Sequence, residues 1–456
     1  MTAPGSDSAP RSGDGGAAGL ARVGAAALPP ATPPEGPDGH RWRADLSLLR
    51  DRDFALLFLA RVVSVFGGAL TPIALAFAVL DLPGGDASSL GLVLTAQAVP
   101  QIVFMLFGGV LADRFPRARV MMAAELLAGA VTLAAALLLL TGNATVSAIA
   151  ALAALNGVAV AFLFPALTGI VPDIVEQGRL QAANALLRLA TNVARILGTA
   201  AAGVLITTLG AGWAVLVDAL TFFAAAVLLV GIRSRHASRE GSWAPLRELR
   251  GGWREFSSRR WVVVVVVGFA FVNLGLAAGL GVLGPVQSNE VLGGAGPWAV
   301  LLTAEAVGTV LGVFVAMRLR PRRPMFVAVA AAPLVAVPFA LLAIPAPLWL
   351  IAVTAFVAGV AIDVFSVLWD TALQQNVPED SLSRVSAYDW LGSSLLQPVG
   401  LAIAGPVALA LGTGSALWLC AAVIAVPLLL AMLDPQVRRL PAFHYTDAAT
   451  PRAAST

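Results

Sequence analysis

FGGVLADRFPRARVMMAAE, residues 107–125, places Asp113, Arg114, Arg117 and Arg119 within seven residues, between two long hydrophobic runs. The chain has 456 residues, of which 58% are hydrophobic and only 12% are charged. These are too few polar side chains to cover a water-soluble globule. The sequence therefore predicts an integral membrane protein, and we expect the charged cluster in a short loop at one hydrated membrane face.

Apolar stretches of roughly 20 residues, the length that a helix needs to cross about 30 Å of hydrocarbon, recur from Phe54 to Leu433. The twelve predicted spans are 54–80, 89–111, 118–140, 146–170, 184–209, 212–232, 261–284, 298–317, 325–344, 348–373, 385–411 and 414–433. Backbone polar groups in lipid must pair within each segment, and no alternating pattern indicates a barrel. The spans are therefore predicted to be helices.

All 29 basic residues are arginines. They cluster at 41–52, 114–119, 233–260, 318–323 and 438–439, which fall on one side of the membrane if successive spans alternate in direction. The loops at the opposite side contain no arginine. The positive-inside rule therefore predicts that both termini are cytoplasmic. We call the two sides the arginine end and the arginine-free end of the spans.

Several other classes of protein are excluded by residues that the chain lacks. Its single cysteine, Cys420, cannot form an internal disulfide, and no Cys/His cluster suits a metal. No P-loop is present, and His40, His236 and His444 all lie in the tails or loops. We expect no cofactor, no catalytic set, no nucleic-acid partner and a monomeric protein in the lipid bilayer.

Two similar stretches indicate an internal repeat. VPDIVEQGRLQAANAL begins at Val171 and VPEDSLSRVSAYDWL begins at Val377, and in both a Val-Pro pair is expected to end one helix before the next span. Two parallel six-span halves are an arrangement typical of transporters. The predicted organisation is a disordered cytoplasmic tail at 1–45, halves at 46–232 and 261–435, an arginine-rich linker at 233–260 and a tail at 436–456.

The stretch Gly109-Val-Leu-Ala-Asp113-Arg114-Phe-Pro116-Arg117 resembles the signature loop of the major facilitator superfamily, with Pro116 where that signature has its second glycine. Pro suits the first turn of a helix, so the turn should persist. Residues 48–435 also resemble the drug-exporter branch that includes macrolide-efflux and enterobactin-exporter-like proteins. The stretches that carry this likeness are LLRDRDFALLFLARVVSVFGGALTPIALAFAVLDL, FLFPALTGIVPDIV and WAVLVDALTFFAAA. The resemblance implies an all-α integral membrane fold of twelve transmembrane helices in two six-helix halves.

The resemblance also implies a conformational latch. Asp113 would meet the N-terminus of the eleventh span near Arg384, where the helix dipole favours a negative charge, when the cytoplasmic side is closed. The alternative is that Asp113 only caps the third span. The predicted latch loop comprises Gly109, Asp113, Arg114, Arg117 and Arg384.

Charged residues inside the spans are candidate functional residues, because each costs roughly 2.5–3.5 kcal/mol at a helix centre. Arg188 and Arg195 lie seven apart, on one face of the fifth span, and Glu305 lies near the middle of the eighth. In the resembled fold these spans pack together, so an ion pair between Arg195 and Glu305 is expected. The alternative gives each residue a separate polar partner or a water-filled cavity.

Asp363 and Asp370 also lie seven apart, in the tenth span, which lines the central cavity in the resembled fold. Asp363 is the deeper and is a candidate proton carrier, because desolvation can bring a carboxylate into the working pH range. The alternatives are a structural hydrogen bond or an ion pair with Arg61 or Arg188. Asp218, in the sixth span, is expected to make a structural polar contact.

Two further patterns have both a packing and a functional interpretation. Small residues at 194–203, with Thr199 where Pro is expected, are a degraded form of a family antiporter signature and also suit close helix packing. Six aromatic residues on presumed cavity helices either form an apolar substrate site or pack within the halves. They are Phe162, Phe164, Phe269, Phe271, Phe365 and Trp369.

The favoured function is secondary export of a hydrophobic or amphipathic small molecule, such as a drug, natural product or siderophore-like compound, against protons across the cell membrane. The main rival is a non-transporting scaffold or sensor with the same fold. A membrane enzyme is disfavoured by the lack of a catalytic set. Paired charges near the membrane midplane and a state-dependent latch favour the transporter, because a scaffold needs neither.

Overall fold

The computed structural model describes residues 47–176, 179–232, 253–319, 321–344 and 346–440, and within these it omits the side chains of 106–114, 164–165, 168–169, 181, 379–380 and 383–384. Over the described residues the chain is helical. Twelve helical segments are long and apolar enough to cross a membrane, running from Arg52–Leu80 to Thr413–Ala431. The predicted spans are therefore confirmed, with ends that differ by a few residues.

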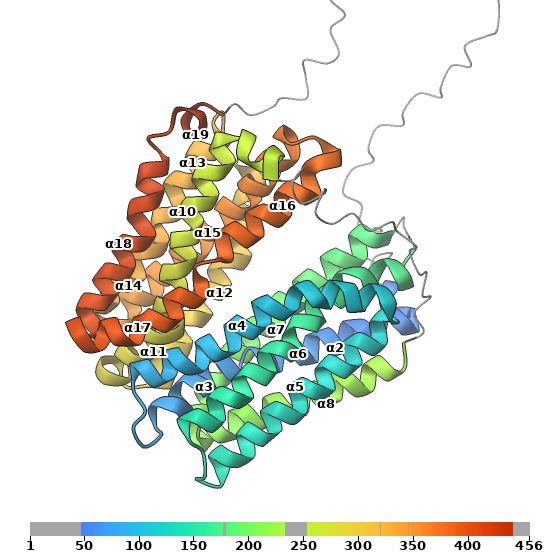
Figure 1. The fold of residues 1–456 in the computed structure, drawn as a ribbon, viewed down its shortest axis with the longest axis vertical. Coiled ribbons are helices and arrows are strands. Elements are labelled where there is room, and N and C mark those ends of the chain that lie inside the picture. Colours follow the sequence, from blue (N-terminus) through green and yellow to red (C-terminus); the bar gives the residue numbers. More distant parts are fainter. Residues whose placement is uncertain (1–46, 177–178, 233–252, 320, 345, 441–456) are drawn as a thin grey trace, which may run out of the picture. The chain divides into compact units, whose positions relative to one another are not determined.

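The helices before residue 233, here called the N-terminal half, follow one another as antiparallel spans (Figure 1). Their bounds are η1 (Ser47–Arg50), α2 (Arg52–Gly68), α3 (Thr71–Leu80), α4 (Ala87–Arg114), α5 (Arg117–Leu140), α6 (Val146–Ile174), α7 (Leu180–Leu209) and α8 (Ala211–Val230).

The helices after residue 252, here called the C-terminal half, repeat this plan with more interruptions. Their bounds are α10 (Arg260–Leu276), η3 (Ala277–Leu283), α11 (Gly284–Gln287), η4 (Ser288–Leu292), α12 (Ala295–Arg318), α13 (Pro324–Ala331), η5 (Ala332–Ala336), α14 (Val337–Ala343), α15 (Leu348–Asn376), α16 (Glu379–Ser394), α17 (Gln397–Leu411), α18 (Thr413–Ala431) and α19 (Pro435–Arg439). The domain boundaries stay a prediction, because 1–46 and 233–252 lie outside the described residues.

The first span of each half is interrupted at an equivalent place. α2 and α10 are both 17 residues long, and each is followed by a change of helix geometry. After α2 the chain turns at Ala69 and Leu70 before α3 begins at Thr71, with Pro72 in its first turn, and after α10 it widens into the π-helix η3. Pro fits the first turn of a helix, where no intrahelical bond to its nitrogen is needed. Both interruptions place irregular backbone within a span, as transporters do near their sites.

The repeat around the two Val-Pro pairs needs a correction. α6 does not end at Val171-Pro172 but continues to Ile174, and the extended residue that follows is Val175. α15 does end before its Val-Pro pair, with Val377 extended and Pro378 preceding α16. Membrane helices tolerate an internal proline when neighbouring groups satisfy the freed backbone. Pro116 likewise precedes α5 as its N-cap and does not lie inside the first turn.

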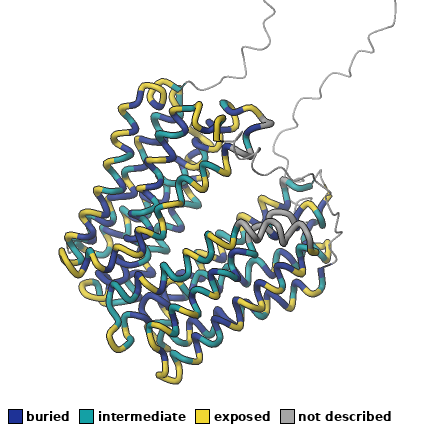
Figure 2. Tube along the Cα trace, viewed as in Figure 1, coloured by how far each residue is buried: buried dark blue, intermediate teal, exposed yellow. Residues whose placement is uncertain are grey.

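The two halves pack against each other through small residues near the arginine-free end. α4 contacts α17, and α7 contacts α12. A Cβ at Gly91 would lie 2.6 Å from the Leu401 carbonyl oxygen, and one at Gly405 would lie 2.3 Å from Ser88 Cα. Glycine is needed at both positions, because any side chain would separate the two helices. Buried and exposed positions alternate along most of the helices (Figure 2), whereas α3 is buried at every position from Ile73 to Val79.

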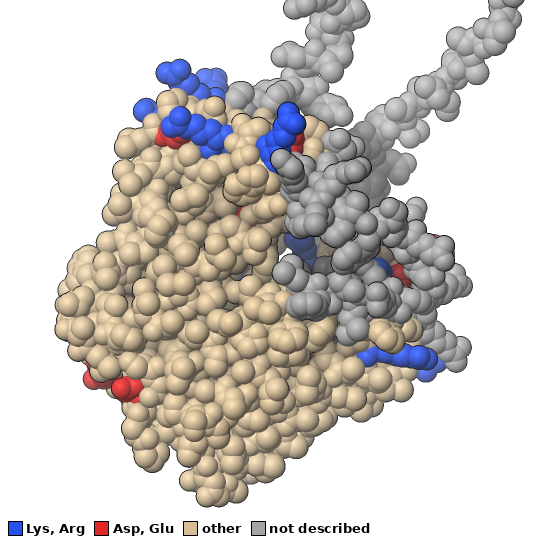
Figure 3. Space-filling model, in the orientation of Figure 1, with Lys and Arg blue, Asp and Glu red and all other residues tan. Residues whose placement is uncertain are grey.

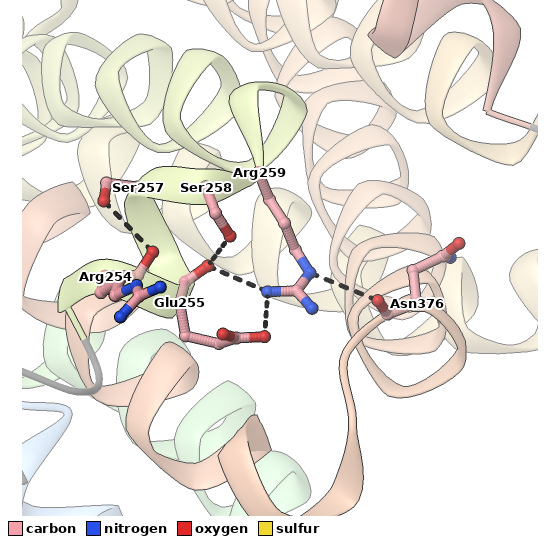
Figure 4. A network of polar contacts seen from close by, with 6 residues as sticks. All are labelled: Arg254, Glu255, Ser257, Ser258, Arg259 and Asn376. Carbon is pink, nitrogen blue, oxygen red and sulfur yellow. Dashed lines mark hydrogen bonds and ion pairs between the residues drawn. The ribbon is translucent and has the colours of Figure 1, made fainter.

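Arginines crowd the arginine end of the C-terminal half, while uncharged side chains cover its flanks (Figure 3). The chain enters this half through a helical turn at 253–258. There Arg259 Nη1 lies 2.8 Å from Glu255 Oε1, and Arg259 Nε donates to the Asn376 carbonyl at 3.4 Å (Figure 4). The rings of Trp253 and Tyr388 meet edge to face at 5.6 Å. These contacts fix the start of the half to the ends of α15 and α16.

Candidate functional site

Two arginines project from one face of α7. Arg188 and Arg195 are separated by two helical turns, and both side chains are exposed although the helix is long and apolar enough to span the membrane. A guanidinium deep in a span faces a water-filled cavity or a counter-charge, because contact with lipid is costly. The electrostatic partners of both arginines are carboxylates of the C-terminal half.

Those carboxylates belong to α12 and α15. Arg195 attracts both Glu305 and Asp363, and Arg188 attracts Asp370. α7 starts at the arginine end and α15 finishes there, so equal spacings of seven residues bring the two arginines and the two aspartates to matching depths. A row of positive charge on the N-terminal half thus faces a row of negative charge on the C-terminal half.

Arg195 and Glu305 do not form a direct ion pair in this conformation. Among the described residues, the charged atoms that approach within 4.0 Å belong to Arg117–Asp173, Arg259–Glu255 and Arg260–Asp434. Arg195 divides its attraction between Glu305 and Asp363. The expected pairing stays a prediction, and Asp363 is the additional partner that the sequence interpretation did not assign to Arg195.

Glycines press α12 against α15 beside these carboxylates. A Cβ at Gly359 would lie 2.1 Å from the Glu305 carbonyl oxygen, and one at Gly312 would lie 2.8 Å from Asp363 Cβ. Asp363 Oδ2 is buried and accepts no hydrogen bond from the described residues. The close helix pair therefore holds Asp363 rigidly, with one oxygen free to bind a proton or a moving donor.

Asp389, on α16, belongs to the same region and was missed by the sequence interpretation. Trp369 Nε1 donates to Asp389 Oδ2 at 2.9 Å, and Asp389 also repels Asp370. It lies inside the predicted eleventh span, 385–411, but was not considered among the charged residues of the spans. The sequence did not show that Trp369, which donates to Asp389, is buried.

The aromatic residues mainly pack α10 against α15. Phe269 and Phe365 stack with their ring centroids 4.0 Å apart, and Phe365 stacks with Trp369 at 6.0 Å. Phe365 and Trp369 are buried in the core, whereas Phe271 is exposed beside α18. Phe162 contacts Phe104, and the side chain of Phe164 lies outside the described set. A substrate-binding role for the six residues stays a prediction.

Comparison with known proteins identifies the family. Residues 57–401 match the family model described as Major Facilitator Superfamily. The chain belongs to the Major Facilitator Superfamily. It is therefore a multi-pass membrane transporter of small molecules and not an enzyme.

Curated relatives within this superfamily are distant but cover nearly the whole chain. The enterobactin exporter EntS of Escherichia coli O1:K1 / APEC is 26% identical over 409 residues, which cover 86% of this chain and 95% of the relative. EntS of Shigella boydii serotype 18 is similar to the same extent.

Solved structures share the fold at low sequence identity. The nucleoside transporter NupG has a TM-score of 0.66 at 14% identity, covering 83% of this chain and 98% of NupG. A bacterial homolog of the human lysosomal transporter Spinster, in an inward-facing and unoccupied conformation, has a TM-score of 0.57 at 15% identity, covering 88% and 98% of the two chains.

The stretch that resembles the superfamily's signature runs from the last turns of α4 to the start of α5. Gly109, Asp113 and Arg114 lie in the last turns of α4, and Arg384 lies in α16, but their side chains are outside the described set. The latch therefore stays a prediction. Arg117 is described, and its Nη1 lies 3.2 Å from Asp173 Oδ1, which joins the start of α5 to the end of α6. This contact gives Arg117 a structural role within the N-terminal half.

Arg61 has its partner inside the N-terminal half and not on α15. It attracts Glu125 of α5, a residue that the sequence interpretation did not consider. Asp218 makes polar contacts of the kind expected, accepting hydrogen bonds from Thr71 and, at 3.4 Å, from Thr221. The intramembrane charges thus form two groups, one between the halves and one within the N-terminal half.

Proposed function

We propose that this Major Facilitator Superfamily transporter exports a hydrophobic or amphipathic small molecule and couples export to proton entry. The observation that carries the proposal is the opposition of Arg188 and Arg195 to Glu305, Asp363 and Asp370 across the two halves. Similarity to an enterobactin exporter over 86% of the chain supports export of a natural product, siderophore-like compound or drug.

Proton binding would act on the attraction between the halves. When Asp363 is ionised, it attracts Arg195 toward α15. A proton on Asp363 would remove this part of the attraction and leave Glu305 as the carboxylate that still attracts the arginine. A ligand or proton shifts a conformational equilibrium only by its differential affinity for the two states. Asp363 meets this condition, because its surroundings include a guanidinium carried by the opposite half.

Orientation follows from the arginine loops. With the arginine end in the cytoplasm, both termini are cytoplasmic and the helix packing of Gly91 with Leu401 closes the external side. The charged rows are then reached from the cytoplasm, which is the side from which an exporter collects its substrate. We propose a monomer in the cell membrane, with halves at 46–232 and 261–435 joined by the linker at 233–260.

The test is transport by the full-length protein reconstituted in inverted vesicles, with a panel of hydrophobic and amphipathic compounds, with and without a pH gradient. Wild type should accumulate at least one compound when the gradient is imposed. Asp363→Asn should lose gradient-driven accumulation while it still binds that compound. Glu290→Gln, which alters an exposed carboxylate at the arginine-free end of the seventh span, is the matched control and should behave as wild type.

Two results would overturn the proposal. Accumulation by Asp363→Asn equal to that of wild type under a pH gradient would remove Asp363 as the proton carrier. Binding of compounds by wild type without any movement across the membrane, in either gradient direction, would favour the scaffold or sensor.

A further inference from the structure

A second group of charged side chains is enclosed within the N-terminal half, away from the rows between the halves. Glu125 of α5 and Asp218 of α8 are each only 1% exposed. Ser64 Oγ donates to Glu125 Oε1 at 3.0 Å and to Oε2 at 3.2 Å, and Arg61 lies close enough to attract Glu125. Both acids are therefore anchored by side chains of neighbouring helices.

Asp218 is held where the first span changes direction. Thr71, the first residue of α3, donates to Asp218 Oδ2, while Thr221 donates to Oδ1. On the other side of the turn, Gly67 of α2 passes so close that a Cβ would lie 1.7 Å from Thr221 Oγ1 and 2.7 Å from Asp218 Oδ1. Side-chain hydrogen bonds thus connect the α2 segment to Glu125 and the α3 segment to Asp218.

The charges of this group do not balance. Glu125 and Asp218 repel each other, and Arg61 is the one basic side chain that the described helices of this bundle direct at them. Arg188 and Arg195 of the adjacent α7 have their partners in the C-terminal half. The facing helices α4 and α6 contribute the amides Gln97 and Asn156, so two ionised carboxylates would leave one uncompensated negative charge.

A small cavity with a few polar groups lies beside Thr71, the residue that donates to Asp218. It has a volume of about 30 Å³, and Thr71, Gln97, Thr132 and Asn156 provide its polar lining. Gln97 Nε2 donates to Asn156 Oδ1 at 3.1 Å, and Asn156 Nδ2 donates to Thr132 Oγ1 at 3.2 Å. A water needs roughly 10–15 Å³ and two to four polar partners. The cavity offers room and partners for a water in contact with Thr71.

We propose that the buried group of Glu125, Asp218 and Arg61 holds one exchangeable proton, and that a water in the cavity beside Thr71 delivers it to Asp218 through the Thr71 hydroxyl. In the transfer, a hydronium in the cavity gives a proton to Thr71 Oγ1 while the hydroxyl hydrogen of Thr71 passes to Asp218 Oδ2, which leaves water, an intact threonine and a neutral aspartic acid. The proton balances the charge of the group, because an unpaired charge in the interior is otherwise very unfavourable.

This site is distinct from the carboxylates of α12 and α15, and it would be linked to the turn in the first span. A proton on Asp218 alters its bond to Thr71 of α3, whereas a proton on Glu125 weakens its attraction to Arg61 of α2. The position of the exchangeable proton therefore changes which segment of the first span is held more firmly.

The test is infrared spectroscopy of the full-length protein in lipid nanodiscs at neutral pH, where a protonated carboxyl group gives a carbonyl stretching band of its own. Wild type should show this band, and Asp218→Asn and Glu125→Gln should each remove it or shift it. Asp363→Asn and the exposed Glu290→Gln should leave it unchanged, which separates this site from the proposed coupling site.

Thr71→Val provides a variant that keeps both acids. It should retain the band but slow its shift in heavy water, because the hydroxyl relay is gone. The proposal is overturned if the band is absent from wild type, if it survives unchanged in both acid variants, or if Thr71→Val exchanges as fast as wild type.

Discussion

Gly359→Ala tests how the α12–α15 contact holds the carboxylates in place. A Cβ at Gly359 would lie 2.1 Å from the Glu305 carbonyl oxygen and 2.9 Å from the Thr309 nitrogen, whereas ordinary contact begins at 3.4 Å. Both neighbours are backbone atoms, so they cannot rotate away as a side chain would. The two helices must therefore separate by about 1 Å at this point, given the close packing of protein interiors.

The expected loss of stability follows from two opposing effects. Overpacking of a tight contact costs typically about 1–3 kcal/mol, and replacing glycine by alanine within a helix returns roughly 0.5–1 kcal/mol. The net destabilisation should be on the order of 1–2 kcal/mol. The transport rate should fall by more than the loss of stability alone would cause, because Glu305 and Asp363 move relative to Arg195. A displacement of 1 Å can lower the rate about 10²-fold at a site that depends on exact positioning.

The assay compares thermal unfolding and transport of reconstituted Gly359→Ala with those of Gly268→Ala. A Cβ at Gly268, inside α10, would meet Leu428 Cδ2 at 3.7 Å, an ordinary contact. That control should match or slightly exceed wild-type stability. If Gly359→Ala proves as stable and as active as Gly268→Ala, close glycine packing does not position the carboxylates.

Three other sets of substitutions test separate parts of the molecule. Arg195→Ala and Glu305→Ala should each impair folding or transport, and exchanging the two residues should restore part of the loss; no recovery in the exchanged variant would refute their pairing. Asp113→Asn should shift the protein toward its inward-open state, so that cysteines placed at the cytoplasmic ends of α7 and α12 react faster with an impermeant thiol reagent, and Arg384→Ala should add little; equal labelling rates would reduce Asp113 to a helix cap. Partial desolvation raises the pKa of Asp81, an exposed residue at the end of α3, so the folded chain holds this proton more tightly than the unfolded chain. The contribution of Asp81 to the unfolding free energy should therefore fall as pH rises from below the ordinary value of 3.8 through the raised pKa, and Asp81→Asn should abolish that part of the pH dependence; identical stability profiles would argue against it.

The spans were readable from the sequence because they depend on local properties. An apolar run of sufficient length specifies a membrane helix whatever surrounds it, and the arginines at one end of alternate spans predict the orientation. The signature stretch at 107–125 likewise indicated the family, which the match over residues 57–401 establishes. The breaks in the spans were harder to predict, since Pro172 lies inside α6 whereas Pro72 lies in the first turn of a new helix, α3.

Which charges face one another was decided only by the tertiary structure. Spacing placed Arg188 with Arg195 on one face and Asp363 with Asp370 on another, but it could not give the rotation of α7 and α15 about their axes. Ser64 and Glu125 are 61 residues apart, and Thr71 and Asp218 are 147 apart. A nearly uniform apolar composition hides which side of each helix is buried, so such partners emerge only when the helices pack.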